Sequence, residues 1–329
     1  MITPDSLRAG AASGDLDEMI SGLRAFAIPM PVRFRGITVR EGALIGGPAG
    51  WGEFSPFAEY GPKESARWLA SAIESATLGW PASVRDRIPV NVTVPAVGPA
   101  RAAAIVARSG CRTAKVKVAE RGQAEAEDIE RVEAVRDALG PDGRIRVDAN
   151  GAWEPGQAAR MLRRLARFGL EYAEQPCATL DELAELRRHI DIPVAADESI
   201  RRAEDPLRVR AAGAADIVML KVQPLGGVRA ALEVAEACGL PVVVSSAVDT
   251  SVGLAAGVAL AAALPDLPYA CGLGTMSLLA GDVTAGPLRP EAGWLPVRRP
   301  AVDPGELARW ETDPVPWRER ASAAARYLP

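Results

Sequence analysis

Short β-branched runs alternate with helical segments at a regular spacing between about residues 90 and 272. There are eight such runs, separated by segments with helical periodicity and without a hairpin signal. Helical crossovers make successive strands parallel, and eight parallel strands favour a closed, TIM-like (β/α) barrel in an α/β protein. An open, doubly wound sheet is the alternative. The runs begin at Val90, Ala114, Arg144, Leu170, Ile192, Ala215, Pro241 and Tyr269.

The segments on either side of this alternation have a different pattern. Residues 24–56 contain alternating, glycine-punctuated β-like runs, and the helix-prone segment ESARWLASAIESAT follows them. We therefore predict an α+β capping domain over residues 1–89 and a barrel over residues 90–280. Residues 281–329 are rich in proline and tryptophan and lack the strand–helix spacing. We expect them to form a tail that packs back on the capping domain.

Composition excludes several classes of function. The chain of 329 residues is 48% hydrophobic and 24% charged, with a net charge of −4, which is typical of a globular protein. It has no dense basic run with interleaved aromatics, so a nucleic-acid partner is not expected. The N-terminus does not resemble a secretory signal, and the most apolar stretch, residues 252–264, is shorter than the roughly 20 residues of a membrane helix. We expect a cytoplasmic protein without a membrane partner, either a monomer or a homo-oligomer.

Scarce residue types and missing motifs narrow the chemistry further. His189 is the only histidine, which excludes a histidine-based hydrolase triad and a histidine-rich zinc site. The four cysteines lack CxxC spacing, so we expect reduced thiols. The sequence has neither a GxGxxG motif after a first strand nor a GxxxxGK[ST] motif, so nothing favours a nucleotide cofactor.

Lysine is rare in this chain, and three of its four lysines occur at strand positions. Of the 38 basic residues 34 are arginine, whereas Lys115 and Lys117 lie in the second run (TAKVKVAE) and Lys221 ends the sixth. Strands 2 and 6 of an eight-stranded barrel are diametrically opposed, so Lys117 and Lys221 would face each other across its mouth. Unlike arginine, lysine can lose its proton near neutral pH and act as a base. The alternative is that the first two lysines only solvate an edge strand.

Three successive runs end in a carboxylate: Asp148 in VDAN, Glu174 in AEQP and Asp197 in ADES. The gaps of 26 residues (148 to 174) and 23 residues (174 to 197) equal one βα unit each, so the acids should lie side by side on the rim. An all-oxygen set favours Mg²⁺ over zinc, although any one acid could instead cap the next helix. Together with the lysines, the set indicates proton abstraction next to a substrate carboxylate, with a metal-stabilised enediolate.

The motifs KVK, VDAN, EQP, ADES and LK, with GWGEFSP upstream, resemble those of the enolase superfamily, specifically its muconate-lactonising branch. The resemblance implies that Lys117 is the general base and Lys221 its partner. It also implies that Asp148, Glu174 and Asp197 bind Mg²⁺, for which Mn²⁺ can substitute. Lys115 falls on a position that contacts or tunes the substrate, a small-molecule carboxylate.

Within this branch, the turn VVSSAVDTSVGLA is similar to that of members that dehydrate 2-succinyl-6-hydroxy-2,4-cyclohexadiene-1-carboxylate in menaquinone synthesis. This likeness implies substrate contacts for Ser245, Ser246 and Arg146, although the serines could simply cap a helix. A helix starting near Thr250 would present free backbone N–H groups to an anionic substrate arm. The loop that closes over the substrate would lie at residues 30–36; because it is short, no contact is assigned to it.

Other members with the same lysine pair are N-succinylamino acid racemases, dipeptide epimerases and muconate cycloisomerases, and the rim chemistry serves all of them. The epimerases commonly carry an acidic DxD motif at strand 8, whereas this chain has CGLGT there, which favours a substrate without a free amine. From another class, an inactive barrel could serve as a binding subunit. The intact set of three acids and three lysines argues against that reading.

Overall fold

The computed structural model describes residues 13–200 and 205–328. Its barrel contains seven parallel strands in the order β11-β10-β9-β8-β7-β6-β5. Each strand is three to five residues long and is buried except at the first residue of β7 and the first two of β8, as expected for β-branched runs covered by helices on the outside. The strands are β5 (Val92–Val94), β6 (Thr113–Lys117), β7 (Arg144–Asp148), β8 (Leu170–Glu174), β9 (Val194–Ala196), β10 (Ile217–Leu220) and β11 (Val242–Val244).

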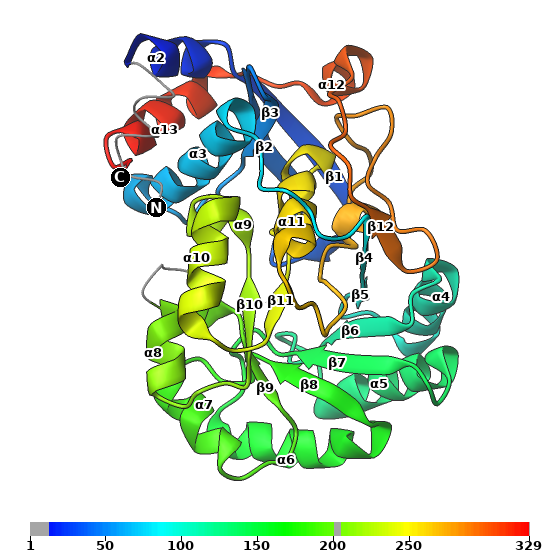
Figure 1. Ribbon diagram of the computed structural model, residues 1–329. Helices are drawn as coiled ribbons and strands as arrows, with labels where there is room; N and C mark the ends of the chain where they lie inside the picture. The colour runs from blue at the N-terminus through cyan, green and yellow to red at the C-terminus, as the bar shows by residue number, and fades with distance from the viewer. Residues whose placement is uncertain (1–12, 201–204, 329) are drawn as a thin grey trace.

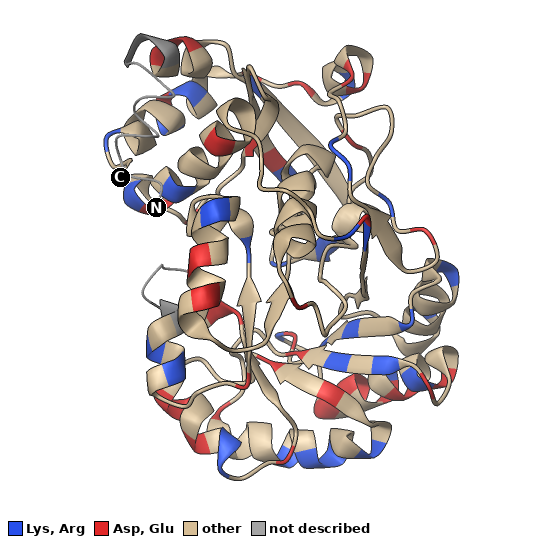
Figure 2. Ribbon diagram, viewed as in Figure 1, with Lys and Arg blue, Asp and Glu red and all other residues tan. Residues whose placement is uncertain are grey.

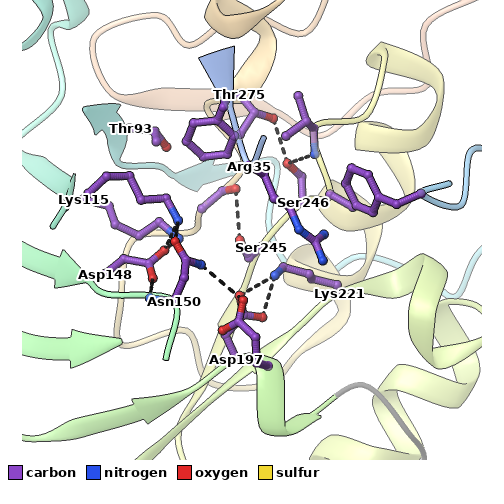
Figure 3. Close-up of a pocket in the computed structure, with 17 residues that line it drawn as sticks. Arg35, Thr93, Lys115, Asp148, Asn150, Asp197, Lys221, Ser245, Ser246 and Thr275 are labelled. Carbon is purple, nitrogen blue, oxygen red and sulfur yellow. Dashed lines mark hydrogen bonds and ion pairs between the residues drawn. The ribbon is translucent and has the colours of Figure 1, made fainter. Parts of the chain in front are cut away.

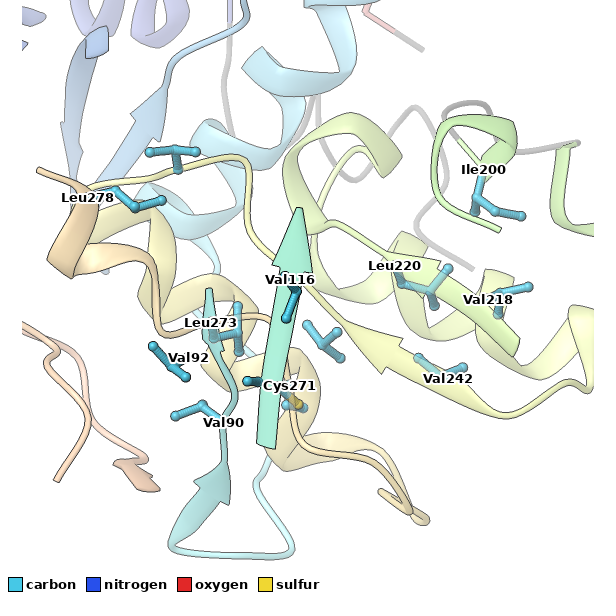
Figure 4. Packing of buried hydrophobic residues seen from close by; sticks show 14 of the residues in the cluster. Val90, Val92, Val116, Ile200, Val218, Leu220, Val242, Cys271, Leu273 and Leu278 are labelled. Carbon is cyan, nitrogen blue, oxygen red and sulfur yellow. The ribbon is translucent and has the colours of Figure 1, made fainter. Parts of the chain in front are cut away.

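The eighth predicted strand is reduced to two parallel bridges, which close the sheet. Cys271 bridges to Val90 and Gly272 bridges to Ser245. The Gly272 N–H donates to the Val244 carbonyl at 2.8 Å. The predicted α/β fold with a TIM-like parallel barrel is therefore confirmed, although the eighth strand that closes it is shorter than the sequence suggested. Figure 4 shows Val92, Val116, Leu220 and Leu273 packed among the buried apolar residues of this region.

Helices connect the strands and cover the outside of the barrel (Figure 1). Charged residues occupy their outer faces: Arg160 and Arg164 of α6 form ion pairs with Glu125 of α5, and Figure 2 shows the two signs side by side there. The described residues contain no helix long and apolar enough to cross a membrane. The connecting helices are α4 (Pro99–Ser109), α5 (Glu125–Leu139), α6 (Pro155–Leu165), η1 (Ala166–Phe168), α7 (Leu180–Arg187), η2 (Glu198–Ile200), α8 (Asp205–Ala211), α9 (Val222–Leu225), α10 (Val228–Cys238), α11 (Ser251–Ala263) and η3 (Thr275–Leu278).

The capping domain is an antiparallel sheet covered by helices. Strands β1 (Arg24–Phe34), β2 (Ile37–Gly47) and β3 (Gly50–Phe54) are adjacent in the order β1-β2-β3, and α3 (Pro62–Thr77) packs on them. Gly52 permits this packing, because a Cβ there would lie 2.0 Å from the Ala72 carbonyl oxygen of α3. Helix α2 (Ser13–Ser21) lies beside α13. Residues 1–12 of the predicted domain lie outside the described part.

The C-terminal tail returns to the capping domain. Helix α13 (Val315–Ala325) packs on α3, with Ala321 and Ala324 in the core that also contains Phe54 and Leu69. Strand β12 (Trp294–Pro296) pairs with β4 (Arg87–Pro89), and α12 (Pro304–Trp310) lies near β1. Helix α11, whose residues 251–262 are all buried, lies between the capping sheet and the barrel (Figure 1). The capping domain is thereby seated over the carboxyl ends of the strands.

Candidate active site

The strand register brings the predicted acids and lysines to one rim. Lys117, Asp148 and Glu174 are partners across β6, β7 and β8, so these three strands end level with one another. Asp197 directly follows β9, and Lys221 directly follows β10. The predicted constellation therefore assembles from the ends of five neighbouring strands, which is where barrel enzymes place their reacting groups.

Each of the three site lysines is paired with a carboxylate, and Figure 3 shows Lys115 beside Asp148 and Lys221 beside Asp197. Lys115 Nζ lies 3.0 Å from Asp148 Oδ2 and 2.7 Å from Glu174 Oε1. Lys117 Nζ lies 2.6 Å from Asp148 Oδ2, and it also donates to Asn150 Oδ1. Lys221 Nζ contacts both carboxylate oxygens of Asp197 at 2.5 Å. The three ammonium groups thus surround the three acids within one buried cluster.

Burial and charge act in opposite directions on these groups. Burial alone would disfavour the ionised form of Asp148, but the Lys115 and Lys117 ammonium groups hold its pKa well below the usual range. The pKa of Asp197 is also lowered, because the charge of Lys221 outweighs its burial. Burial and the neighbouring Asp148 carboxylate raise the pKa of Glu174 to about 8. Burial would lower the pKa of Lys115, but Asp148 and Glu174 hold it well above the ordinary value.

The acids fit a hard divalent cation by two criteria. All three offer only oxygen donors, and Glu174 Oε2 is a buried oxygen without a hydrogen-bond partner. A buried carboxylate oxygen in that state is stabilised by a cation or a donor. The described residues contain no group of three His, Cys, Asp or Glu side chains already arranged around one point. The lysines lie among the acids instead, so a bound cation would share or replace their ion pairs.

Between the lysines lies a cavity of about 40 Å³. Lys115, Lys117 and Lys221 all line it, together with Asp148 and Asp197. Several further lining residues were not assigned individually from the sequence, although most of them lie in segments singled out there, such as residues 30–36, VDAN, ADES and CGLGT. They are Phe34, Arg35 and Phe57 of the capping domain, and Thr93, Asn150, Glu198, Ala247, Val248, Gly272 and Thr275 of the barrel.

The tip of the β1–β2 hairpin supplies the capping-domain part of the cavity wall. Arg35 has a φ of 51° and Gly36 a φ of 79°, which makes the tight turn that the Arg-Gly pair allows. Arg35 Nη2 lies 3.2 Å from the Tyr60 hydroxyl, and its guanidinium stacks 4.1 Å from the centre of the Phe57 ring. Lys117 Nζ lies 5.1 Å from the Phe34 ring centre. The residues 30–36 singled out in the sequence thus end in this tip.

Ser245 and Ser246 both line the cavity and are buried. Ser245 Oγ lies 3.5 Å from the Gly272 carbonyl, and Ser246 Oγ lies 2.8 Å from Thr275 Oγ1 (Figure 3). Ser246 Oγ also accepts the Val248 N–H at 3.2 Å. Neither serine caps α11, whose N-cap side chain is that of Thr250.

The predicted free N–H groups at the start of α11 are not free, and this prediction is wrong. The N–H groups of Thr250 and Gly253 donate to Glu53 Oε2 at 3.0 and 3.1 Å. The Ser251 N–H donates to Asp282 Oδ1 at 3.0 Å. This helix N-terminus is buried between the two domains, and its donors therefore need partners from the chain itself. Two carboxylates of the protein occupy the position that was expected to face a substrate anion.

Arg146 lies away from the cavity. Its side chain is fully buried at the barrel floor, where Nε donates to Glu171 Oε2 at 2.6 Å and Nη1 to the Ala270 carbonyl at 2.6 Å. Its guanidinium lies 4.6 Å from the centre of the Tyr172 ring. It shares a strand face with Asp148 but sits two residues deeper, about 6.6 Å at the usual strand rise. Arg146 is thus the register partner of Lys115 on the neighbouring strand, but unlike Lys115 it does not line the cavity.

Family models match both parts of the chain. The model described as "Enolase C-terminal domain-like" matches residues 99–305, and the model described as "Enolase N-terminal domain-like" matches residues 25–76. The first match alone covers more than half of the chain. The chain belongs to the enolase superfamily. The resemblance drawn from the KVK, VDAN, EQP, ADES and LK motifs is thereby confirmed.

Curated members of the superfamily share most of this sequence. The chain is 72% identical to a protein of Thermobifida fusca named o-succinylbenzoate synthase, over 92% of this chain and 95% of that one. It is 56% identical to a protein of Mycolicibacterium smegmatis with the same name, over 89% and 91% of the two chains.

Solved structures support the fold. A muconate lactonizing enzyme from Pseudomonas fluorescens, complexed with muconolactone, aligns with a TM-score of 0.77 and 24% identity, over 88% of this chain and 98% of that one. A dipeptide epimerase from Enterococcus faecalis aligns with a TM-score of 0.71 and 23% identity, over 85% and 96% of the two chains. At these identities the likeness bears on the fold and not on the substrate.

Proposed function

We propose that this chain is an o-succinylbenzoate synthase, a hydro-lyase. It converts 2-succinyl-6-hydroxy-2,4-cyclohexadiene-1-carboxylate to 2-succinylbenzoate by syn elimination of water, a step of menaquinone synthesis. The observation that carries the proposal is the convergence of Lys117 and Lys221 on one cavity beside three buried carboxylates. The relatives named for this activity, at 72% and 56% identity, support the same assignment.

Asp148, Glu174 and Asp197 would hold a Mg²⁺ ion, which Mn²⁺ could replace. Their oxygens suit a hard cation, and the unpartnered Glu174 Oε2 is directly available to it. A cation held there supplies positive charge where negative charge develops on the substrate carboxylate. Lys115, which already pairs with two of these acids, adds a second fixed positive charge on the same side.

Lys117 removes the proton from the ring carbon that bears the carboxylate, and it then delivers that proton to the departing hydroxyl. The electrons of the broken C–H bond first pass into the substrate carboxylate, which gives an anionic intermediate. They then form the new ring double bond as the C–O bond breaks, so water leaves and the ring becomes aromatic. Lys117 takes the proton as a neutral amine, and Asn150 Oδ1 and the Phe34 ring position its Nζ. Lys221 remains an ammonium on the opposite side, oriented by Asp197, and stabilises the anionic intermediate.

The succinyl arm lies against the opposite wall of the cavity. Ser245 and Ser246 offer hydroxyl groups there, and Arg35 at the hairpin tip offers a guanidinium. A cavity of about 40 Å³ holds roughly one water molecule, so the substrate must displace the hairpin tip or the lysine side chains as it enters. The strand-8 segment contributes Gly272 and Thr275 to the cavity wall, without the acidic DxD motif that the epimerases commonly carry there. This favours the synthase over a dipeptide epimerase.

We also propose the division into a capping domain (residues 1–89), a barrel (90–280) and a tail (281–329), and a cytoplasmic location. The pairing of β4 with β12 and the packing of α13 on α3 support the division.

The activity is tested with purified protein and saturating Mg²⁺, by following the ultraviolet absorbance of the aromatic product. Turnover that depends on the metal is expected. Absence of turnover at full metal occupancy would overturn the assignment.

A further inference from the structure

The turn between β11 and α11 forms one wall of the cavity and has an unfavourable backbone conformation. We define the cavity turn as residues 245–250. Ser245, Ser246, Ala247 and Val248 all line the cavity. Val248 has a φ of 63°, a region that β-branched residues rarely adopt. Such a conformation persists only where the surroundings hold it in place, and it is typical of functional sites.

Arg40 of the capping domain holds this residue directly. It lies on β2 with only 2% of its surface exposed, and its Nε donates to the Val248 carbonyl at 3.0 Å. Its Nη2 donates to the Ser55 carbonyl at 2.6 Å and to Ser55 Oγ at 2.7 Å. The guanidinium is thus fixed on the capping side and reaches across the domain boundary to the strained peptide.

Glu53 of β3 holds the other end of the turn. Its Oε2 accepts the N–H groups of Thr250 and Gly253 and the Thr250 hydroxyl, and its Oε1 accepts the Ser55 hydroxyl at 2.6 Å. Burial and the Asp249 carboxylate raise the pKa of Glu53 to about 7, whereas Arg40 and the hydrogen bonds from Ser55 and Thr250 favour its ionised form. Arg40 of β2 and Glu53 of β3 are linked through Ser55, so both ends of the turn are attached to the capping sheet.

Asp249 and Gln223 connect the turn to the segment that carries Lys221. Asp249 Oδ2 accepts the Ala247 N–H at 3.2 Å, and its Oδ1 accepts Gln223 Nε2 at 2.7 Å. Gln223 lies two residues after Lys221 in the chain, and its Oε1 lies 3.4 Å from Ser55 Oγ. The catalytic strand end, the cavity turn and the capping sheet therefore share one buried hydrogen-bond network.

We propose that Arg40 and Glu53 are positioning residues for the substrate's succinyl arm: they hold the cavity turn in the strained shape that presents Ser246 and Val248 to the cavity. The assignment to the succinyl arm rests on the proposed function. Neither residue lines the cavity, so each acts through the turn. The motif GWGEFSP, which the mechanism does not otherwise use, contains both Glu53 and Ser55.

Glu74 provides a matched control for simple domain docking. It is a capping-domain carboxylate on α3, 1% exposed, that accepts the Val228 N–H at 2.6 Å and the Arg229 N–H at 3.2 Å at the start of α10. The preceding residue there is Gly227, for which a φ of 133° is readily accessible. Glu53 and Glu74 thus make the same kind of cross-domain cap, but only Glu53 holds a turn that lines the cavity.

The kinetic test measures KM and kcat at saturating Mg²⁺ for three single variants, Glu53→Gln, Glu74→Gln and Val248→Gly. It also includes the double variant Glu53→Gln/Val248→Gly. We expect Glu53→Gln to raise KM at least tenfold with kcat within threefold, while Glu74→Gln lowers the unfolding temperature but leaves KM within twofold. In the Val248→Gly background, where the left-handed conformation needs no support, Glu53→Gln should change KM less than threefold. Equal KM effects of Glu53→Gln and Glu74→Gln, or an undiminished effect in the glycine background, would overturn the proposal.

Hydrogen exchange of residues 246–254, measured by mass spectrometry without substrate, separates this proposal from the proposed function. Faster exchange in Glu53→Gln and in Arg40→Lys, but not in Glu74→Gln, supports the holding of the turn. Unchanged exchange in both variants contradicts it whatever the activity. Wild-type protein that shows no turnover would overturn the proposed function and the succinyl-arm assignment together, and the exchange result would then still decide whether Arg40 and Glu53 hold the turn.

Discussion

Replacement of Lys115 by Met should destabilise the metal-free protein, and the loss should grow with pH. Lys115 is 7% exposed and makes ion pairs of 3.0 and 2.7 Å to two fully buried acids. Asp148 would keep Lys117 at 2.6 Å, whereas Glu174 would lose the hydrogen bond to its Oε1. Glu174 is therefore the carboxylate that the substitution destabilises most, because its other oxygen already has no hydrogen-bond partner.

The loss of unfolding free energy in Lys115→Met depends on whether Glu174 is charged. Its pKa is raised to about 8 in the folded protein, above its unfolded value, so the folded state binds the extra proton and metal-free stability falls as pH rises towards 8. At pH 9 Glu174 is ionised in the wild type, where the Lys115 charge favours its carboxylate. Without Lys115 the folded protein must bury an uncompensated charge or take up a proton, at a cost of about 3–5 kcal/mol. At pH 6 it is largely protonated, and the cost falls to the lost hydrogen bonds, about 1–3 kcal/mol.

The assay is urea unfolding followed by circular dichroism at both pH values, in EDTA and in saturating Mg²⁺. The cation should neutralise the acids and reduce the cost of Lys115→Met at pH 9 by at least about half. Lys63→Met is the control, because Lys63 is an exposed lysine outside the site and its loss should change the unfolding free energy by less than about 0.5 kcal/mol. An equal loss of stability in EDTA and in Mg²⁺, or no loss at pH 9, would refute the reasoning.

The remaining predictions concern the base, the metal and the barrel floor. Lys117→Ala and Lys221→Ala should each lower kcat about 10²–10⁴-fold with an unchanged circular dichroism spectrum, whereas Lys63→Ala should not; a variant that stays active would sink the two-lysine mechanism. Because the pKa of Glu174 is about 8, Mg²⁺ affinity measured by calorimetry should rise between pH 6 and 8 with release of protons, and a flat profile would speak against Glu174 as a ligand. Arg146→Met should lower the unfolding temperature, because Glu171 loses a buried partner, and leave KM within twofold; a large KM increase would restore Arg146 to the substrate site.

The rim of the barrel could be predicted because strand ends follow simple geometry. Parallel strands that begin level and run for similar lengths also end level, so the spacing of Asp148, Glu174 and Asp197 was enough to place them side by side. The same argument placed Lys117 and Lys221 correctly around the cavity. The eighth strand was less predictable, since its hydrogen-bonded part is confined to Cys271 and Gly272 before the chain turns into η3.

Other features depend on contacts between distant segments and leave little local pattern. Glu53, which accepts the Thr250 N–H at the start of α11, lies 197 residues away in the sequence. The sequence around Thr250 alone therefore suggested that these N–H groups had no partner. Arg35 reaches the cavity only because the capping sheet is seated over the barrel. Arg146 lies level with Lys115 on the neighbouring strand, but its guanidinium turns to Glu171 and the Ala270 carbonyl instead of the cavity. The two-residue period cannot predict that choice of partners.

The most direct test of the central claim is a crystal structure with Mg²⁺ and the product 2-succinylbenzoate. The account predicts the cation at about 2.0–2.1 Å from oxygens of Asp148, Glu174 and Asp197, with the aromatic ring between the ammonium groups of Lys117 and Lys221. It also predicts the succinyl arm against Ser246 and Val248. A cation bound by other residues, or a ring that does not lie between the two lysines, would contradict it.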